Sequence, residues 1–280
     1  MPDAPPPRRS SPLRRPEGKQ RQFRRRLRAY RQGRPRRPIP RAAVPSFFTL
    51  MNLFSGFLAI TQTLEGNFVQ ACWLIVLAGF FDALDGMMAR LTNGQSLFGV
   101  ELDSLADVVS FGTAPAVLVY VFGLQDFGVL GLIVASLPAI CGAVRLARFN
   151  VSFDGEKKDY FTGLPIPGQA VAIVALILNF QDPNVFLSED NLTLLMPLVF
   201  VLSALMISNI RFEAIPKPSV GYLRAHPRKS LAFGVMLVLT FVWIPAGLLV
   251  SLTAYLVYGI VRALVRVVQQ VMETPIEEEG

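Results

Sequence analysis

The chain has 280 residues, of which 52% are hydrophobic and only 17% charged, and its mean hydropathy of +0.45 argues against an ordinary soluble globule. The formal net charge of +7 is unevenly spread, because residues 1–41 hold 15 of the 27 Lys and Arg residues but only two acids. A basic extension therefore precedes a slightly acidic, apolar body. This distribution excludes nucleic acid as a partner of the whole protein.

The first predicted segment is a basic tail at residues 1–43, in which Pro interrupts short runs of Arg. Such a composition cannot bury a core, so we expect the tail to be disordered and cytoplasmic. Two roles stay open for it: electrostatic attachment to the headgroups of membrane lipids, or a simple topology anchor.

Long apolar stretches follow from Val44 onward, and about 20 residues of helix cross a bilayer core about 30 Å thick. Eight spans are predicted, at residues 44–64, 68–91, 97–122, 127–149, 165–181, 191–210, 230–245 and 247–268. Lys and Arg fall only on one set of alternate connections, which places both termini in the cytoplasm by the positive-inside rule. The predicted fold class is an all-α polytopic membrane protein with about eight transmembrane helices.

The predicted organisation has three parts after the tail. They are a six-helix core at residues 44–229, a C-terminal pair of transmembrane helices at 230–270, and an acidic tail at 271–280. Cys72 and Cys141 lie far apart in apolar stretches, so we expect two reduced packing residues rather than a disulfide or a metal site.

Four carboxylates stand out, because charged groups inside membrane helices are costly and tend to face a polar cavity. Asp82 and Asp85 share one face of the second predicted span, and Asp103 and Asp107 share one face of the third. The short cytoplasmic connection makes these helices antiparallel neighbours, so the four side chains should converge near the cytoplasmic interface. An alternative, a hairpin stabilised by ion pairs, is disfavoured because Arg90 is the only nearby cation.

Four like charges repel strongly unless a cation neutralises them, and a purely oxygen ligand set favours Mg²⁺, Mn²⁺ or Ca²⁺. Paired divalent ions held in this way orient a pyrophosphate. The small residues Gly86, Ala89 and Gly99 would let a bulky ligand approach the backbone, and Arg90 offers a fork to phosphate.

These residues form the pattern Asp82-x-x-Asp85-Gly86-x-x-Ala89-Arg90, eight residues, Gly99-x-x-x-Asp103-x-x-x-Asp107. The pattern resembles the signature of the CDP-alcohol phosphatidyltransferase family. The resemblance implies a homodimeric membrane enzyme that moves a phosphatidyl group from a CDP-lipid to an alcohol and releases CMP, with two divalent cations, Mg²⁺ or Mn²⁺. It implies that Asp82, Asp85 and Asp103 are metal ligands and that Asp107 is both a ligand and the catalytic base. The CDP-lipid contacts that it implies are Thr49, Asn52, Gly86, Ala89, Arg90, Ser96 and Gly99.

The acceptor alcohol is indicated by the surrounding residues. Segments at 45–57, 102–112, 145–150, 163–167 and 208–212 resemble the serine-accepting, integral-membrane branch of that family. The expected reaction converts CDP-diacylglycerol and L-serine to phosphatidylserine and CMP. Serine is a zwitterion whose carboxylate needs a cation, and the candidate contacts for serine or phosphate are Arg145, Arg148 and Asn150, of which Arg148 with Asn150 is favoured.

Other interpretations stay open. Inositol, glycerol phosphate or choline could be the acceptor, and an ion-coupled membrane transporter is a more distant alternative. The expected location is the bacterial inner membrane, with the active site at its cytoplasmic face.

Overall fold

The computed structural model describes residues 40–91, 96–152, 160–181, 193–213 and 245–273, with residues 234–236, 238, 240, 242 and 243. The chain divides into two units, Met1–Pro40 and Arg41–Gly280, and the elements below belong to the second unit apart from the first residue of α2. The basic tail up to residue 39, which is predicted to be disordered, lies outside the described residues. The loop at 214–229 and residues 274–280 of the acidic tail also lie outside them.

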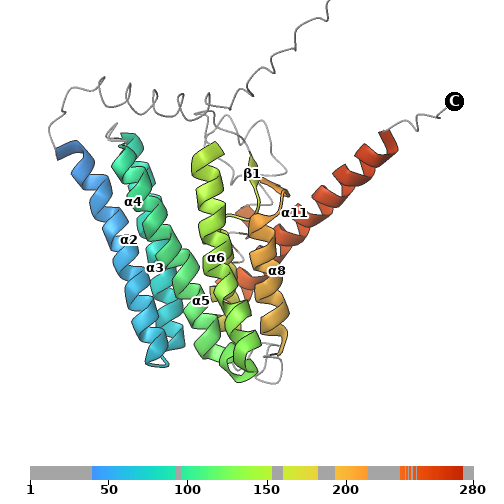
Figure 1. Ribbon diagram of the computed structural model, residues 1–280, viewed down its shortest axis with the longest axis horizontal. Coiled ribbons are helices and arrows are strands. Elements are labelled where there is room, and N and C mark those ends of the chain that lie inside the picture. Colours follow the sequence, from blue (N-terminus) through green and yellow to red (C-terminus); the bar gives the residue numbers. More distant parts are fainter. Residues whose placement is uncertain are drawn as a thin grey trace, which may run out of the picture. The chain divides into compact units, whose positions relative to one another are not determined.

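The described residues are almost entirely helical (Figure 1). In chain order the helices are α2 (Pro40–Leu64), α3 (Phe68–Leu91), α4 (Leu97–Asp107), η1 (Val108–Thr113), α5 (Ala114–Val119), η2 (Tyr120–Leu124), η3 (Gln125–Phe127), α6 (Gly128–Ser152), α7 (Ile166–Phe180), α8 (Leu195–Ile207) and α11 (Ala246–Glu273). The segments η1 and η2 are π-helical, and η3 is a 3₁₀ turn. The run from α4 to η2 forms one leg, and α6 packs beside it as the next.

Two glycines with backbone angles in the left-handed region lie in the short connections between neighbouring helices. Gly66, with φ of 81°, lies between α2 and α3, and Gly128, with φ of 58°, lies where η3 passes into α6. Non-glycine residues rarely adopt these angles, so both glycines follow from the need to turn the chain within a few residues. The turn between α2 and α3 and the turn into α6 lie at the same end of the bundle, opposite the end at which α3 finishes (Figure 1).

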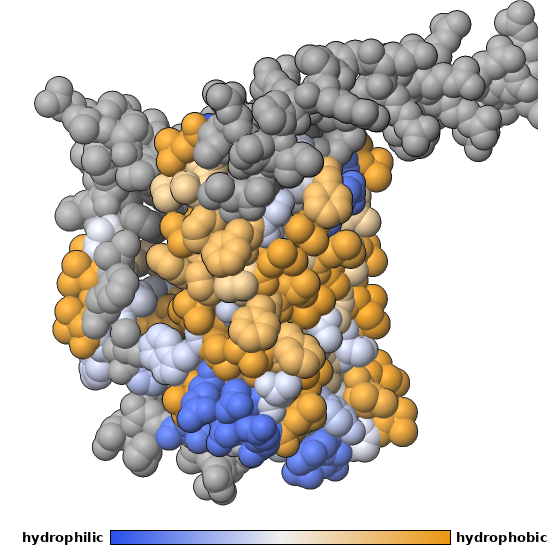
Figure 2. Space-filling view, turned by 90° about the vertical axis from the view of Figure 1, so that its left-hand side faces the viewer, coloured by the Kyte–Doolittle hydropathy of each residue, from blue (hydrophilic) through white to orange (hydrophobic). Residues whose placement is uncertain are grey.

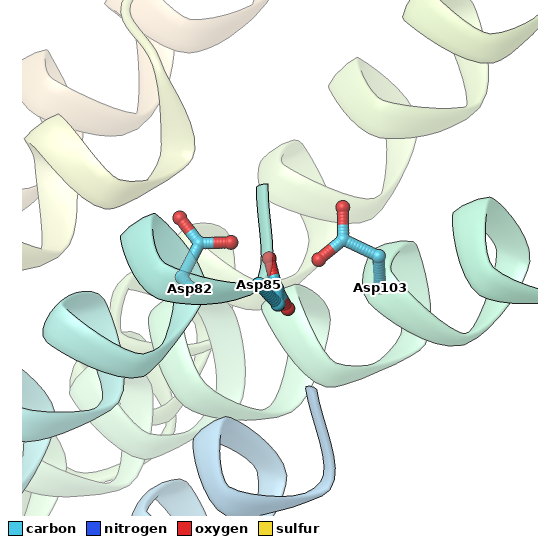
Figure 3. A group of neighbouring side chains, drawn as sticks. All are labelled: Asp82, Asp85 and Asp103. Carbon is cyan, nitrogen blue, oxygen red and sulfur yellow. The ribbon is translucent and has the colours of Figure 1, made fainter. Parts of the chain in front are cut away.

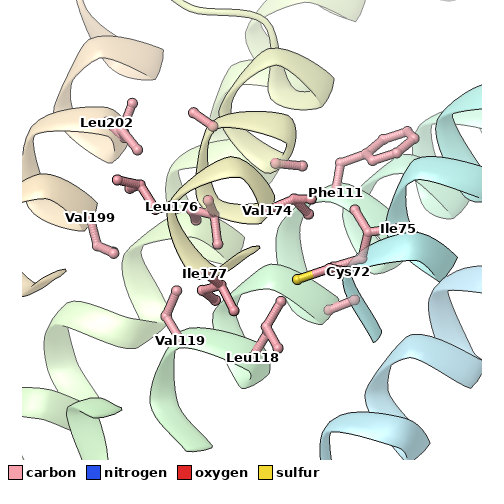
Figure 4. Packing of buried hydrophobic residues seen from close by; sticks show 14 of the residues in the cluster. Cys72, Ile75, Phe111, Leu118, Val119, Val174, Leu176, Ile177, Val199 and Leu202 are labelled. Atoms are coloured by element: carbon pink, nitrogen blue, oxygen red, sulfur yellow. The ribbon is translucent and has the colours of Figure 1, made fainter. Parts of the chain in front are cut away.

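The core is centred on α7, whose side chains are buried on almost every side. A helix that is apolar all round is stable only when other helices enclose it, and α7 contacts α3, α5, η1, α8 and α11. Figure 4 shows Val174 and Ile177 of α7 among side chains from these neighbours, including Cys72, Phe111 and Val199. Cys72 and Cys141 are both buried free thiols, which confirms the prediction of packing cysteines.

The outer surface is apolar to an extent that soluble proteins do not show. Along α2 the exposed side chains include Phe47, Leu50, Phe54 and Phe57, spaced so that they share one face of the helix. Figure 2 shows a broad apolar surface on this side of the molecule, with hydrophilic residues gathered at its lower end. Large contiguous apolar surfaces of this kind mark contact with lipid or a partner.

Three helical stretches of the described residues are long and apolar enough to cross a membrane. They are Ser46–Leu64, Phe68–Leu91 and Phe98–Val151, of which the last contains both legs from α4 to α6. Three shorter apolar helices, Ile166–Phe180, Leu195–Ile207 and Ala246–Arg262, accompany them. Helices lie within the predicted spans 44–64, 68–91, 97–122, 127–149, 165–181, 191–210 and 247–268, although α8 covers only Leu195–Ile207 of the sixth, and the span at 230–245 is described only at scattered helical positions.

One pair of strands departs from the all-α prediction. β1 (Tyr160–Thr162) pairs antiparallel with β2 (Arg211–Glu213), with Phe161 opposite Phe212. The pairing continues where the Gly163 N–H donates to the Ile210 carbonyl oxygen at 2.8 Å. Three-residue strands carry no hydrophobic periodicity that a sequence could reveal, and this pair joins the start of α7 to the end of α8.

Candidate metal centre and active site

Three carboxylates from two helices converge at one point. Asp82 and Asp85 come from α3 and Asp103 comes from α4, and one oxygen of each lies within 4.8 Å of the others. Figure 3 shows the three side chains projecting into the same space between the two helices. The predicted convergence of these residues is therefore present in the structure.

Asp107 lies one helical turn beyond Asp103 on α4 and is 8% exposed. It interacts electrostatically with Asp82, Asp85 and Asp103, so all four carboxylates belong to one electrostatic cluster. Its Oδ1 accepts a hydrogen bond of 3.3 Å from Asn52 Nδ2. The tight group of three does not include Asp107, which sets it apart as the member at the edge of the cluster.

Helix α2 supplies hydrogen-bond donors to both carboxylate pairs. Thr49 Oγ1 donates to Asp85 Oδ2 at 2.9 Å, and Asn52, one turn further along, donates to Asp107. Thr49 is 3% exposed and Asn52 is fully buried, so neither donor faces bulk solvent. In this structure these two residues, which were predicted to contact a CDP-lipid, orient the carboxylates.

The donor set fits a hard divalent cation. All the converging atoms are carboxylate oxygens, which suit Mg²⁺, Mn²⁺ or Ca²⁺ and not the softer metals. Asp103 Oδ1 is buried and has no hydrogen-bond partner among the described residues. A buried carboxylate oxygen without a partner is costly, and a bound cation would satisfy it.

The other predicted CDP-lipid contacts lie beside the cluster, near the end of α3 and at the start of α4. A Cβ placed on Gly86 would meet no atom within 4 Å, so the backbone there borders open space. Arg90 Nε donates to the Gly86 carbonyl oxygen at 2.8 Å, and Ala89 is half-buried between them on α3. Ser96 caps α4, because its Oγ accepts from the Gly99 N–H at 2.9 Å.

The three residues predicted to contact serine lie in different surroundings. Arg145 is 7% exposed, interacts electrostatically with Asp107, and its Nε has no hydrogen-bond partner among the described residues. Arg148 is exposed and donates to the carbonyl oxygens of Ile207 and Ser208 at 3.3 and 3.4 Å. Asn150 Nδ2 donates to Ser104 Oγ at 2.9 Å. Arg145 therefore interacts with the carboxylate cluster, and the hydrogen bonds of Arg148 and Asn150 connect α6 to the end of α8 and to α4.

Residues not singled out by the sequence also reach the site. Ser110 of η1 donates through Oγ to the Asn52 carbonyl oxygen at 2.9 Å, and Gly56 lies against Ser110. Ser104 stands on α4 between Asp103 and Asp107 in sequence and accepts from Asn150. The sequence marked these residues only as part of the segments 45–57 and 102–112, and it did not reveal that the partners of Ser104 and Ser110 lie 46 and 58 residues away.

The fold and the site together define a helical integral membrane protein with a carboxylate centre suited to divalent cations. A family model described as CDP-alcohol phosphatidyltransferase matches residues 42–204, and the chain belongs to this family. Members of the family generally depend on a divalent cation, which agrees with the cluster of Asp82, Asp85 and Asp103.

Named relatives extend the comparison over most of the chain. A Helicobacter pylori protein named CDP-diacylglycerol–serine O-phosphatidyltransferase is 38% identical over 78% of this chain and 90% of its own length. A protein of the same name from Methanocaldococcus jannaschii is 37% identical over 78% of this chain and 93% of its own length. An archaetidylserine synthase from Methanothermobacter thermautotrophicus is 41% identical over 62% of this chain and 70% of its own length.

Proposed function

We propose that this protein transfers the phosphatidyl group of CDP-diacylglycerol to the hydroxyl of L-serine, forming phosphatidylserine and CMP. The observation that carries the proposal is the convergence of Asp82, Asp85 and Asp103, with Asp107 one turn away, in a membrane helix hairpin. The names of relatives that align with over three-quarters of the chain support serine as the acceptor.

In the proposed reaction Asp107 is the general base. It accepts the proton of the serine hydroxyl while the serine oxygen bonds to the phosphorus of the phosphatidyl phosphate. The bond from that phosphorus to the bridging oxygen breaks, and CMP leaves with the bridging oxygen. Asn52 donates to Oδ1 of Asp107, so the proton would pass to the other carboxylate oxygen.

The remaining carboxylates are the proposed metal ligands. Asp82, Asp85 and Asp103 would hold divalent cations, Mg²⁺ or Mn²⁺, together with Asp107. When bound, two such cations would orient the pyrophosphate and stabilise charge on the attacking and leaving oxygens. Thr49 fixes the orientation of Asp85 by its hydrogen bond, so that the carboxylate would bind a cation without reorganisation.

The proposed CDP-lipid surface comprises Gly86, Ala89, Arg90, Ser96 and Gly99, with the predicted contacts Thr49 and Asn52 buried behind it against the carboxylates. It is open at Gly86, where no atom lies within 4 Å of the place a Cβ would take, and this openness supports the approach of a bulky headgroup to the backbone. Arg90 would exchange its bond to the Gly86 carbonyl for a bond to phosphate.

For the serine carboxylate we propose Arg145 as the main contact. It is a buried cation near Asp107, and its Nε lacks an acceptor among the described residues. Arg148 and Asn150 would shape the same pocket from the cytoplasmic end of α6. A carboxylate held by Arg145 would bring the serine hydroxyl toward the general base.

The proposal extends to the arrangement in the membrane. We propose eight spans, with both termini and the active site on the cytoplasmic side of the bacterial inner membrane, and a homodimeric assembly. The catalytic core would be residues 44–229, followed by the helix pair at 230–270.

This topology can be tested with cysteines introduced at Glu65 and Arg90, which lie at opposite ends of α3. They should react with impermeant reagents from opposite sides of the membrane. Labelling of both from one side would overturn this topology.

The activity is tested by supplying purified protein with CDP-diacylglycerol, Mn²⁺ or Mg²⁺, and one candidate alcohol at a time. Serine should cause CMP release and formation of phosphatidylserine, whereas inositol, glycerol phosphate and choline should not. CMP release with another alcohol but not with serine would refute the acceptor. No CMP release with any alcohol would refute phosphatidyl transfer and favour the transporter hypothesis.

A further inference from the structure

A buried hydrogen bond connects α2 to η1 next to the carboxylate cluster. Ser110 is fully buried, and its Oγ donates at 2.9 Å to the carbonyl oxygen of Asn52, 58 residues earlier. That carbonyl belongs to the interior of α2, where it also serves as the acceptor for the N–H four residues later, at Gly56. The serine hydroxyl therefore anchors one turn of a membrane helix to its neighbour at the level of Asn52.

The contact depends on the absence of a side chain at Gly56. A Cβ at this position would lie 2.7 Å from Ser110 Cα and 2.9 Å from Ser110 Cβ, and real Cβ atoms do not approach that closely. Ser110 also lies inside the π-helical segment Val108–Thr113, and short π-helical segments occur frequently at functional sites. Gly56 and the wide turn together allow α2 and η1 to approach until their backbones nearly touch.

The anchored part of α2 is the part that serves the carboxylates. The residue whose carbonyl Ser110 holds is the same residue whose side-chain amide donates to Asp107. One turn earlier on α2, Thr49 donates to Asp85. A shift of α2 away from η1 would lengthen both hydrogen bonds, because both donors move with the helix.

We propose that Ser110 is a positioning residue of the active centre: seated in the gap at Gly56, it holds α2 where Asn52 and Thr49 orient Asp107 and Asp85. The inference rests on the metal site of the proposed function. Its alternative is a serine that only satisfies packing, which would affect stability but not the carboxylates.

The first test compares two buried serines whose hydroxyls donate to carbonyl oxygens of α2. Ser55 Oγ donates to the Met51 carbonyl within α2 itself, at 2.8 Å, so Ser55→Ala removes a similar bond without touching the link to η1. Binding of Mn²⁺ to the full-length protein in detergent is measured by the spin resonance of free Mn²⁺. Ser110→Ala should weaken Mn²⁺ binding about three- to tenfold, the effect of one hydrogen bond. Ser55→Ala should bind as the wild type does.

Equal binding by Ser110→Ala and the wild type would overturn the proposal, as would equal weakening by Ser55→Ala. A double-mutant cycle supplies a second test, because Ser110 is proposed to act partly through Asn52. Ser110→Ala combined with Asn52→Ala should weaken Mn²⁺ binding by less than the product of the two single effects. An effect equal to the product would show that Ser110 acts independently of Asn52 and would also overturn the proposal.

The same measurements separate this inference from the proposed function. A wild type that binds Mn²⁺ but releases no CMP would refute the proposed reaction and leave the comparison of serines readable. An active wild type with unchanged Mn²⁺ affinity in Ser110→Ala would refute only the positioning role. A wild type that does not bind Mn²⁺ would refute the metal site and the positioning role together.

Discussion

At the scale of single residues, the four aspartates of the cluster are distinguished by their partners. Asp85 and Asp107 are buried and each accepts a hydrogen bond from α2, whereas Asp82 and Asp103 are half-buried. Asp103 also has a buried oxygen without a partner among the described residues. The same residue type is therefore held in different ways, which suits a site where some carboxylates bind metal and one transfers a proton.

Asp107→Asn should abolish turnover while CDP-diacylglycerol still binds, because an amide is the size of a carboxylate but cannot accept the serine proton. General base catalysis contributes about 10²–10⁴ to a rate, so CMP release should fall at least about a hundredfold. Asp126→Asn, an exposed change in η3, is the matched control and should leave the rate unchanged. Normal turnover in Asp107→Asn would contradict the assignment of the base.

Arg145→Gln should raise the KM for serine, because it removes the buried cation that we place against the serine carboxylate. A hydrogen bond to a charged group contributes about 1.5–3 kcal/mol, so the KM should rise at least about tenfold. Arg148→Gln is the comparison, because that guanidinium already donates to the Ile207 and Ser208 carbonyls and its loss should mainly lower thermal stability. Steady-state kinetics with varied serine separate the two, and a larger KM effect in Arg148→Gln would move the serine contact to Arg148.

At the scale of helices, the site depends on how closely α2 approaches the leg that begins at α4. Gly56→Ala should lower both stability and activity, since the new Cβ would overlap Ser110. Overpacking of this kind costs about 1–3 kcal/mol. Gly79→Ala is the control, because a Cβ there would make ordinary contact with the Phe111 ring at 3.8 Å. Thermal unfolding and CMP release measure the two effects, and equal behaviour of the two variants would contradict the tight contact.

The sequence predicted the helices well, because each span is a long apolar run interrupted by Gly, Pro or charge. The predicted second span, 68–91, coincides with α3 at both ends. Convergence of Asp82, Asp85 and Asp103 was also predictable, because spacing fixes the helix face and a short connection fixes the neighbour. Contacts between distant segments were not, since no local pattern pairs Ser110 with Asn52 or β1 with β2.

At the scale of the whole molecule, the carboxylate cluster opposes folding when no cation is bound. Like charges a few ångströms apart repel by about 1–4 kcal/mol per pair at the dielectric of a protein surface or water. In the proposed function the protein therefore gives up stability at the carboxylate cluster in exchange for the capacity to hold metal, a trade commonly found at active sites.

Asp103→Asn should reveal this loss of stability as a change in the melting temperature. With a chelator present the variant should melt about 2–4 °C above the wild type, as expected for roughly 1 kcal/mol in a chain of this size. With saturating Mn²⁺ the order should reverse, because the wild type gains more from binding. Asp126→Asn should match the wild type under both conditions, and a variant less stable than the wild type in chelator would contradict the repulsion.

The π-helical segment Val108–Thr113 has a consequence for the whole leg from α4 to η2. Its wide turn is marked by hydrogen bonds from Thr113 Oγ1 to the Val108 carbonyl and from the Ala114 N–H to the Val109 carbonyl, each spanning five residues. Removing one residue there would leave the helix continuous but rotate its two halves by about 100° relative to each other. Asp103 and Asp107 could then no longer face α3 while Ala114 and Leu118 face the core. The wide turn thus sets the angular phase between the half of the helix that carries the aspartates and the half that packs into the core.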